Sequence, residues 1–239
     1  MANDDMNFFF VLSSNRIEKV GTQDEDGTRE VLQQPHKRTR FSIQIERETR
    51  QTKDAVDFIE TLWSEVNEVS ELTRPHNKCR VALLTVPNIL ESHRLFMKGL
   101  IPNAGEVRTT EVCTLTDKGV HYYEVAYKAG PALQGLVDRL NLRIVACKTV
   151  ADVLSIATEW LLEFLNIHPF SDGNGRVGRL WLAYLLFSYF PFVISIPWGL
   201  RDDYIAALEA NSKEKLAAVI EQSVCLAVTS FDKAMRRPR

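Results

Sequence analysis

The chain has 239 residues, of which 45% are hydrophobic and 25% are charged, as expected for a globular protein that buries a sizeable core. Its 29 Lys and Arg residues nearly balance its 31 Asp and Glu residues, so the formal net charge is −2. This balance argues against non-specific nucleic-acid binding, which usually needs a strongly basic surface.

Signals for export, membrane insertion and a structural zinc site are weak. The apolar patch at residues 8–12 is too short for a secretory signal. The most membrane-like stretch, residues 180–196, contains Pro191 and falls short of the ~20 apolar residues that a span needs, so a buried helix is expected there. The cysteines stand far apart, which favours reduced, buried thiols, and the protein is expected in the cytosol, with the nucleus as an alternative. They are Cys79, Cys113, Cys147 and Cys225.

The first half of the chain predicts a short element, a loop and two helices. The short element covers residues 7–20. The polar stretch at residues 22–40 predicts a long exposed loop. From residue 50, apolar residues recur at three- and four-residue intervals, which indicates an amphipathic helix that ends before Pro75. A second helix is expected to start at Val86 or Asn88 and to end at Leu100.

The second half predicts a hairpin followed by helices. Residues 105–127 indicate two short strands around a turn at Lys118 and Gly119. Thr149 is a candidate N-cap for a helix that Pro169 ends, because a proline forces the preceding residue out of helical angles. The helices expected here span residues 132–142, 149–167, 180–190, 201–211 and 213–234. The predicted fold class is therefore all-α, a helical bundle with a small β-hairpin.

One segment, residues 168–179, concentrates the groups that phosphate chemistry needs. Gly173 and Gly175 have no side chain, so the backbone N–H groups around Asn174 can close on an anion. The helix that begins here directs its positive N-terminal end at the same place.

Charged and titratable residues complete this segment. Arg176 and Arg179 lie on one helix face and can donate to two more phosphate oxygens. Asp172 offers a hard carboxylate oxygen to a Mg²⁺ ion on a nucleotide's phosphates. His168 is the one group of the segment that can remove a proton near neutral pH. Each feature alone also fits plain structure, but two arginines in a first turn oppose the helix dipole unless they serve a ligand or a buried acid.

The segment resembles the signature of the Fic family, HxFx(D/E)GNGRxxR, at every specified position. The matching residues are His168, Phe170, Asp172, Gly173, Asn174, Gly175, Arg176 and Arg179. The resemblance implies a Fic-type bundle and a protein adenylyltransferase (AMPylase), which transfers AMP from Mg-ATP to a Ser, Thr or Tyr hydroxyl of a target protein. The kinase-like branch of the family has lysine in place of Gly175.

The same resemblance implies a role for each residue of the segment. His168 would be the general base that takes the proton of the target hydroxyl, and Asp172 would hold Mg²⁺ against the α- and β-phosphates. Phe170 would pack inward and fix the loop. The groups that would bind phosphate oxygens are Gly173, Asn174, Gly175, Arg176 (β-phosphate) and Arg179 (γ-phosphate).

Two further segments resemble parts of the family. Residues 108–112 look like the first strand of the flap, the hairpin that holds a target segment in extended form. Residues 204–211 are similar to the element that receives adenine. The contacts implied are Arg108, Thr109, Thr110 and Val112 for the target, and Tyr204 and Asn211 for adenine.

The N-terminus resembles the family's autoinhibitory motif, (S/T)xxxE(G/N), with Ser14 and Glu18 in place. In the family this glutamate pairs with the second arginine of the signature, here Arg179, and takes the seat of the γ-phosphate. Lys19 departs from the pattern and would weaken the inhibitory helix if its φ is positive. An ordinary exposed amphipathic helix is the alternative. The chain would comprise an inhibitory segment (1–21), an exposed linker (22–49) and a catalytic domain (50–239).

Two other functions stay open. One is a hydrolase that removes AMP from a modified protein, with Glu18 positioning the water. The other is a non-catalytic adaptor for nucleotides or phosphoproteins, which the presence of both His168 and Asp172 disfavours. The expected ligands are ATP and Mg²⁺, and the expected partner is a protein with an exposed hydroxyl side chain. Neither nucleic acid nor a membrane is expected to bind, and the chain could form a homodimer.

Overall fold

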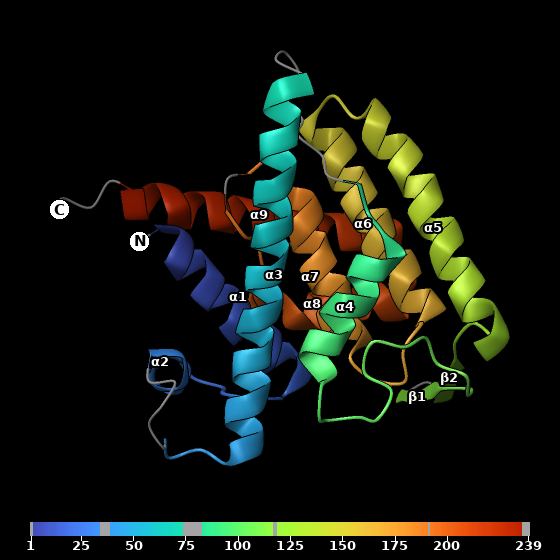
Figure 1. Ribbon diagram of the computed structural model, residues 1–239, viewed down its shortest axis with the longest axis horizontal. Helices are drawn as coiled ribbons and strands as arrows, with labels where there is room; N and C mark the ends of the chain where they lie inside the picture. Colours follow the sequence, from blue (N-terminus) through green and yellow to red (C-terminus); the bar gives the residue numbers. More distant parts are fainter. Residues whose placement is uncertain (1, 34–38, 74–82, 117–118, 191, 236–239) are drawn as a thin grey trace.

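The computed structural model describes residues 2–33, 39–73, 83–116, 119–190 and 192–235, which form a helical assembly with one small hairpin (Figure 1). The helices are α1 (Ala2–Glu18), α2 (Glu25–Gln33), α3 (Ile43–Thr73), α4 (Val86–Met97), α5 (Ala126–Ala146), α6 (Val150–Ile167), α7 (Asn174–Phe187), α8 (Arg201–Glu209) and α9 (Lys213–Met235), with a 3-10 turn η1 (Trp198–Leu200). The predicted bundle with a hairpin is confirmed.

The hairpin consists of β1 (Cys113–Thr116) and β2 (Gly119–Tyr122), which pair antiparallel with Leu115 opposite Val120. Figure 1 shows it at the edge of the bundle, beside the loop that joins α6 to α7. Four residues used in the sequence analysis lie outside the described residues: Pro75, Cys79, Lys118 and Pro191.

Helices α6 and α7 pack along one another at the centre of the bundle. The predicted N-cap of α6 is confirmed, because Thr149 Oγ1 accepts from the Asp152 N–H at 3.2 Å and Asp152 Oδ2 accepts from the Thr149 N–H at 2.9 Å. Helix α6 ends at Ile167, two residues before Pro169 as expected. The cap therefore fixes one end of the helix and the proline the other.

Helix α7 is enclosed on all sides, with residues 176–186 all buried. Trp160 Nε1 of α6 donates to the Gly178 carbonyl of α7 at 3.0 Å. A Cβ at Gly178 would come within 3.1 Å of Leu161 Cδ1, so the glycine permits the close approach of the two helices. The apolar stretch at 180–196 thus begins as a core helix, and none of the described helices is long and apolar enough to cross a membrane.

The prediction of an exposed loop at residues 22–40 is wrong, because α2 lies within this stretch. Helix α3 begins seven residues before its predicted start at residue 50. Thr28 of α2 is fully buried, and its hydroxyl lies 2.7 Å from that of Thr22. The Thr22 N–H donates to Thr49 Oγ1 of α3 at 2.9 Å. These threonines satisfy one another inside the protein, so a polar sequence forms a packed corner. The division into three segments stays a prediction.

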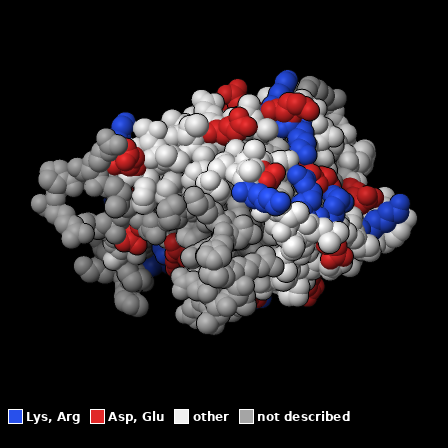
Figure 2. Space-filling view, turned by 90° about the horizontal axis from the view of Figure 1, so that it is seen from above, with Lys and Arg blue, Asp and Glu red and all other residues white. Residues whose placement is uncertain are grey.

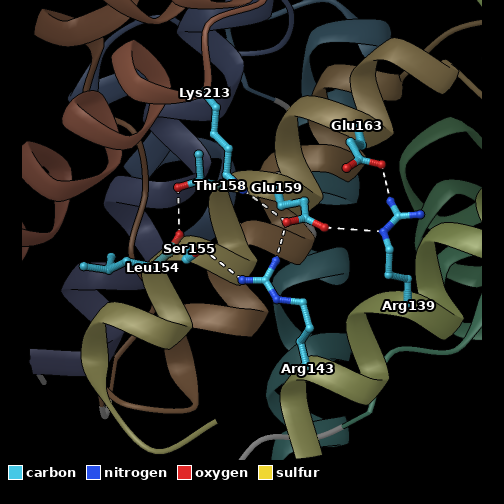
Figure 3. Close-up of polar contacts among 8 residues, drawn as sticks. All are labelled: Arg139, Arg143, Leu154, Ser155, Thr158, Glu159, Glu163 and Lys213. Atoms are coloured by element: carbon cyan, nitrogen blue, oxygen red, sulfur yellow. Dashed lines mark hydrogen bonds and ion pairs between the residues drawn. The ribbon is translucent and has the colours of Figure 1, made fainter. Parts of the chain in front are cut away.

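An ion-pair network joins α5, α6 and α9 (Figure 3). Glu159 of α6 accepts from Arg143 of α5 and from Lys213 Nζ of α9, the latter at 3.1 Å. Arg139 of α5 lies 3.4 Å from Glu159 and also pairs with Glu163. On the face drawn in Figure 2, Lys and Arg side chains likewise lie close to Asp and Glu side chains.

Helix α1 packs against α3 and also contacts α7 and α9. Met6, Phe10 and Ile17 bury their side chains in the main apolar core. The helix begins at Ala2, five residues before the predicted start, and ends at Glu18. The next residue, Lys19, has a φ of 57°, so the chain turns left-handed there.

Candidate active site

The loop between α6 and α7 is shaped by two left-handed residues and one side-chain bridge. His168 ends α6 with a φ of 53°, and Gly173 caps α7 with a φ of 80°. The Asn174 amide closes the loop between them, since its Oδ1 accepts from the Phe170 N–H at 2.9 Å and its Nδ2 donates to the Phe170 carbonyl at 2.8 Å. The Asn174 side chain therefore holds the loop closed, and its contact with phosphate stays a prediction.

His93, a buried histidine that was not predicted from the sequence, packs against this loop and is hydrogen-bonded to it. His93 of α4 stacks on Phe170 with ring centroids 3.7 Å apart. Its Nδ1 accepts from the Gly105 N–H at 2.9 Å, which leaves the proton on Nε2 to donate to the Asp172 carbonyl at 3.0 Å. Burial lowers the pKa of His93 to about 4, so it is neutral at pH 7. Phe170 packs inward, fully buried, as expected.

His168 has the state that a general base requires. Its Nδ1 lies 3.2 Å from the Leu165 carbonyl, so the proton of the neutral ring is on Nδ1 and the lone pair is on Nε2. Burial, with smaller contributions from Arg108 and His121, lowers the pKa of His168 to about 4. The ring is thus neutral and able to accept a proton across the physiological range.

Arg176 and Arg179 are buried in the first turns of α7, 4% and 3% exposed. The Nε of each guanidinium has no hydrogen-bond partner among the described residues. A buried donor without an acceptor lowers the stability of the fold, unless a bound ligand supplies the acceptor. Two arginines at a helix N-terminus with unused donors fit an anion with several oxygens, such as a nucleotide's phosphates.

Arg179 is held by three residues from distant parts of the chain. Its Nη2 lies 2.8 Å from Glu18 Oε1 and 3.4 Å from Ser14 Oγ, both on α1. Tyr204 of α8 is hydrogen-bonded to it as well. The pair that the sequence resemblance implied between Glu18 and Arg179 is therefore present as a contact.

The Glu18 carboxylate fills the space next to Gly175, at the start of α7. A Cβ built on Gly175 would overlap its carboxylate. Burial alone would raise the pKa of Glu18, but Arg179, followed by Arg176 and Arg201, outweighs it and leaves the pKa below its ordinary value. Glu18 is therefore ionised at pH 7, with three guanidinium groups around it.

A buried polar cluster fixes the end of α1 that carries Glu18. Asn15 Oδ1 accepts from the Thr52 hydroxyl of α3 at 3.0 Å. After the turn at Lys19, the Gly21 N–H donates to Glu48 Oε2 of α3 at 2.7 Å. Residues before and after Glu18 in the sequence are thus hydrogen-bonded to α3. The position of the Glu18 carboxylate is therefore set by α3 as well as by Arg179.

A cavity of about 660 Å³ lies between the end of α1, the hairpin, the end of α6 and α8. The predicted site residues that line it are Glu18, His168, Gly175, Arg179, Tyr204 and Asn211. Other predicted residues of the α6–α7 loop (Asp172, Gly173, Asn174 and Arg176) lie outside this lining. The structure thus brings together residues more than 150 positions apart in the chain around one space.

The far wall of the cavity contains two polar residues that the sequence analysis missed. Arg201, at the start of α8, lines it, and so does Asn166 of α6. Asn166 Nδ2 donates to Asn211 Oδ1 at 2.8 Å, so Asn211 is held in place with a positive φ of 46°. Leu165 and Ile205 add apolar surface to the same wall. A wall of this kind suits a flat ring with polar edges.

Asp172 has the properties of a magnesium ligand. Its side chain is 66% exposed; Oδ1 accepts from the Gly173 N–H at 2.6 Å, and Oδ2 lies 4.0 Å from Arg176. No group of three or more His, Cys, Asp or Glu side chains that could hold a metal occurs among the described residues. A single carboxylate fits Mg²⁺, which usually takes one or two carboxylates together with substrate phosphates and water.

The first strand of the hairpin does not cover residues 108–112 as predicted, because β1 begins at Cys113. Thr109 and Thr110 are exposed, and Val112 is half-buried. The four residues expected to contact a target thus precede the paired strand.

Arg108 has a structural task instead. Its side chain is completely buried, and Nε donates to the His168 carbonyl at 2.7 Å while Nη1 donates to the Thr110 carbonyl at 2.9 Å. A third bond reaches the Glu124 carbonyl. The Arg108 side chain ties both ends of the hairpin to the α6–α7 loop, and its contact with a target stays a prediction.

Comparison with known proteins agrees with this geometry. Residues 83–186 match the model of the Fic/DOC family. A Fido domain-containing protein of Dictyostelium discoideum is 35% identical over 114 residues, 47% of this chain and 74% of that protein. Protein adenylyltransferase fic-1 of Caenorhabditis elegans is 31% identical over 141 residues, 58% of this chain and 25% of that protein.

Two further similarities concern a viral protein and a solved structure. A ribonucleoside-diphosphate reductase small chain of Ostreid herpesvirus 1 is 39% identical over 102 residues, 39% of this chain and 18% of that protein. The chain thus spans a quarter or less of the viral and nematode relatives. A Fic domain-containing signaling protein of Bacteroides thetaiotaomicron has the same fold, with a TM-score of 0.77 at 20% identity over 97% of this chain and 89% of that one. On its sequence and its fold, the chain belongs to the Fic/DOC family.

Proposed function

We propose that the protein is an adenylyltransferase that moves AMP from Mg-ATP to a hydroxyl side chain of another protein. The observation that carries the proposal is one short loop that joins a neutral histidine, with its Nε2 lone pair free, to two buried arginines with unused donors. The arginines sit at a helix N-terminus, where an anion is favoured. The distant relation to an adenylyltransferase of Caenorhabditis elegans supports the same reaction.

The chemistry follows from the loop. The target hydroxyl transfers its proton to His168 Nε2 as its oxygen bonds to the α-phosphorus. The bond from that phosphorus to the bridging oxygen breaks, and pyrophosphate leaves with the electron pair. Arg176, Arg179 and the N-terminal N–H groups of α7 stabilise the charge that develops on the phosphate oxygens. A Mg²⁺ ion held by Asp172 would neutralise part of that charge.

Glu18 restrains this reaction in the proposed account. Its carboxylate occupies Arg179 and covers Gly175, where the terminal phosphate of ATP would need the same donor and the same space. Two anions cannot share one buried guanidinium without strong repulsion. The resting chain therefore binds ATP weakly or in an unproductive pose until Glu18 moves away.

Labelled ATP tests the reaction class. The Glu18→Gly chain is incubated with Mg-ATP labelled on either the α- or the γ-phosphate, and protein-bound label is measured. We expect α-label on the protein and none from the γ-position. Label from the γ-position alone would identify a kinase, and no label from either would leave the adaptor as the better account.

Removal of AMP by the same site is a second candidate, because Glu18 and His168 line one cavity. A carboxylate there can orient a water molecule toward a modified side chain. Incubating wild type and Glu18→Gly with a pre-modified target separates the two directions. Loss of AMP only with wild type would assign the hydrolytic role to Glu18.

A further inference from the structure

The hairpin places an aromatic ring directly on the proposed base. Tyr123, the residue after β2, stacks on the His168 imidazole with ring centroids 3.7 Å apart and planes inclined by 18°. Both rings line the cavity, and Tyr123 is only partly exposed. One face of the imidazole is therefore covered by a residue that belongs to the hairpin and not to the α6–α7 loop.

Other hairpin residues hold this ring in place. The Tyr123 hydroxyl lies 2.8 Å from Thr114 Oγ1 on the opposite strand. His121 packs its edge against the Tyr123 ring, with centroids 4.8 Å apart at 77°. Thr114 of β1, Tyr123 and His168 thus form a continuous chain of side-chain contacts from the hairpin to the α6–α7 loop.

We propose that Tyr123 is a positioning residue for His168, which makes the hairpin and the base a single unit. The inference rests on the proposed role of His168 as the base. The Leu165 carbonyl fixes one edge of the imidazole through Nδ1, but a hydrogen bond alone lets the ring tilt. The stacked tyrosine removes that freedom and leaves the Nε2 edge open. Any movement of the hairpin, such as one caused by a bound target, then acts on the base.

The stack also controls the hydration of the imidazole. The groups that act on the charge of His168 are Arg108 and His121, which disfavour the protonated ring, and Asp172, which favours it. Burial is the largest cause of its low pKa, and Tyr123 covers one of its two faces. Removing the aromatic ring admits water to that face, so the pKa should rise toward the ordinary value of about 6.5.

The experiment compares Tyr123→Leu with Tyr123→Phe in the ligand-free full-length chain. The titration of His168 is followed by NMR, with its signal assigned by its absence in His168→Ala. We expect the pKa to rise by one unit or more in the leucine variant and to stay near 4 in the phenylalanine variant, which keeps the stack. In the Glu18→Gly background, kcat for self-modification should fall on the order of 10- to 100-fold with leucine, while the KM for ATP changes less than about twofold.

Tyr122→Leu is the matched control, because Tyr122 is the neighbouring residue on the hairpin and its side chain is 73% exposed. It should leave the His168 titration and kcat unchanged. An unaltered pKa of His168 in Tyr123→Leu overturns the proposal, whatever the activity. Equal loss in Tyr123→Phe also overturns it, because the effect would then belong to the hydroxyl. Because the titration needs no ATP, a failure of the proposed reaction is distinguishable from a failure of this inference.

Discussion

At the scale of the residue, His168 carries the proposed chemistry. Replacing it with alanine removes the only base of the loop but none of the buried guanidinium donors. We expect transfer to fall by about 10²–10⁴-fold, the usual contribution of a general base, while ATP affinity in the Glu18→Gly background changes little. Calorimetric titration with ATP and a transfer assay measure the two effects. Near-normal turnover would show that another group takes the proton.

The low pKa of His168 makes a separate prediction about pH. A folded pKa of about 4 keeps the ring neutral from pH 7.5 down to about 5, so the proposed transfer should decline only below that range. A histidine with an ordinary pKa of about 6.5 would lose roughly tenfold between pH 7.5 and 5.5. We expect less than a twofold decline in kcat/KM over this interval for Glu18→Gly. A tenfold decline would mean that the free base is not desolvated as described.

Lys19 offers a test of the restraint without touching Glu18. Its φ of 57° strains any residue with a side chain, by about 1 kcal/mol or slightly more. Lys19→Gly should therefore stabilise the end of α1, raise the melting temperature and lower basal self-modification about fivefold. Lys19→Ala keeps the strain and serves as the control. Faster self-modification in the glycine variant would contradict the inhibitory role of this turn.

At the scale of the element, Glu159 tests how α5, α6 and α9 are held together. Its side chain is 13% exposed and bridges cations from both neighbouring helices. Burial would raise the pKa of Glu159, but the bond to Lys213 and the charge of Arg143 leave it lowered. A carboxylate with a lowered folded pKa stabilises the protein above its unfolded pKa of about 4.3 and loses that effect as pH falls through the folded value.

Glu159→Gln should thus lower the free energy of unfolding by about 1–2 kcal/mol at pH 7, a figure reduced by the partly exposed partners. The difference from wild type should shrink as the pH falls below about 4. Urea unfolding at both pH values measures it. Glu163→Gln, which loses an exposed pair with Arg139 alone, should cost less than about 0.5 kcal/mol. Equal effects of the two substitutions would refute the bridging role.

Local signals sufficed for the elements that their own residues determine. The N-cap candidate Thr149 and the proline after α6 predicted the bounds of that helix, and the glycines and arginines of one segment marked the site. Helix α2 was missed because its buried Thr28 is hydrogen-bonded to Thr22, which in turn bonds Thr49 of the distant helix α3, a condition that polarity alone does not reveal. The roles of Arg108, His93 and Tyr123 were missed for the same reason, since each of them contacts a residue more than 40 positions away in the sequence.

At the scale of the whole molecule, helix α1, which carries Glu18, shares one hydrophobic core with the helices that carry the proposed site. Met6, Phe10 and Ile17 of α1 are buried with the residues of α6 and α7, so deleting α1 would expose apolar surface as well as remove Glu18. Single substitutions at Glu18 are therefore the cleaner way to release the site. Glu18→Gln keeps the shape and removes the charge, whereas Glu18→Gly removes both.

Intact mass spectrometry after incubation with Mg-ATP is the most direct test of the central claim. We expect Glu18→Gly to gain the mass of AMP rapidly, Glu18→Gln less rapidly and the wild type slowly, with no gain when His168→Ala is added to Glu18→Gly. A gain of phosphate mass, or no gain by Glu18→Gly, would contradict the proposed transfer of AMP. Equal rates in wild type and Glu18→Gly would contradict the restraint by Glu18.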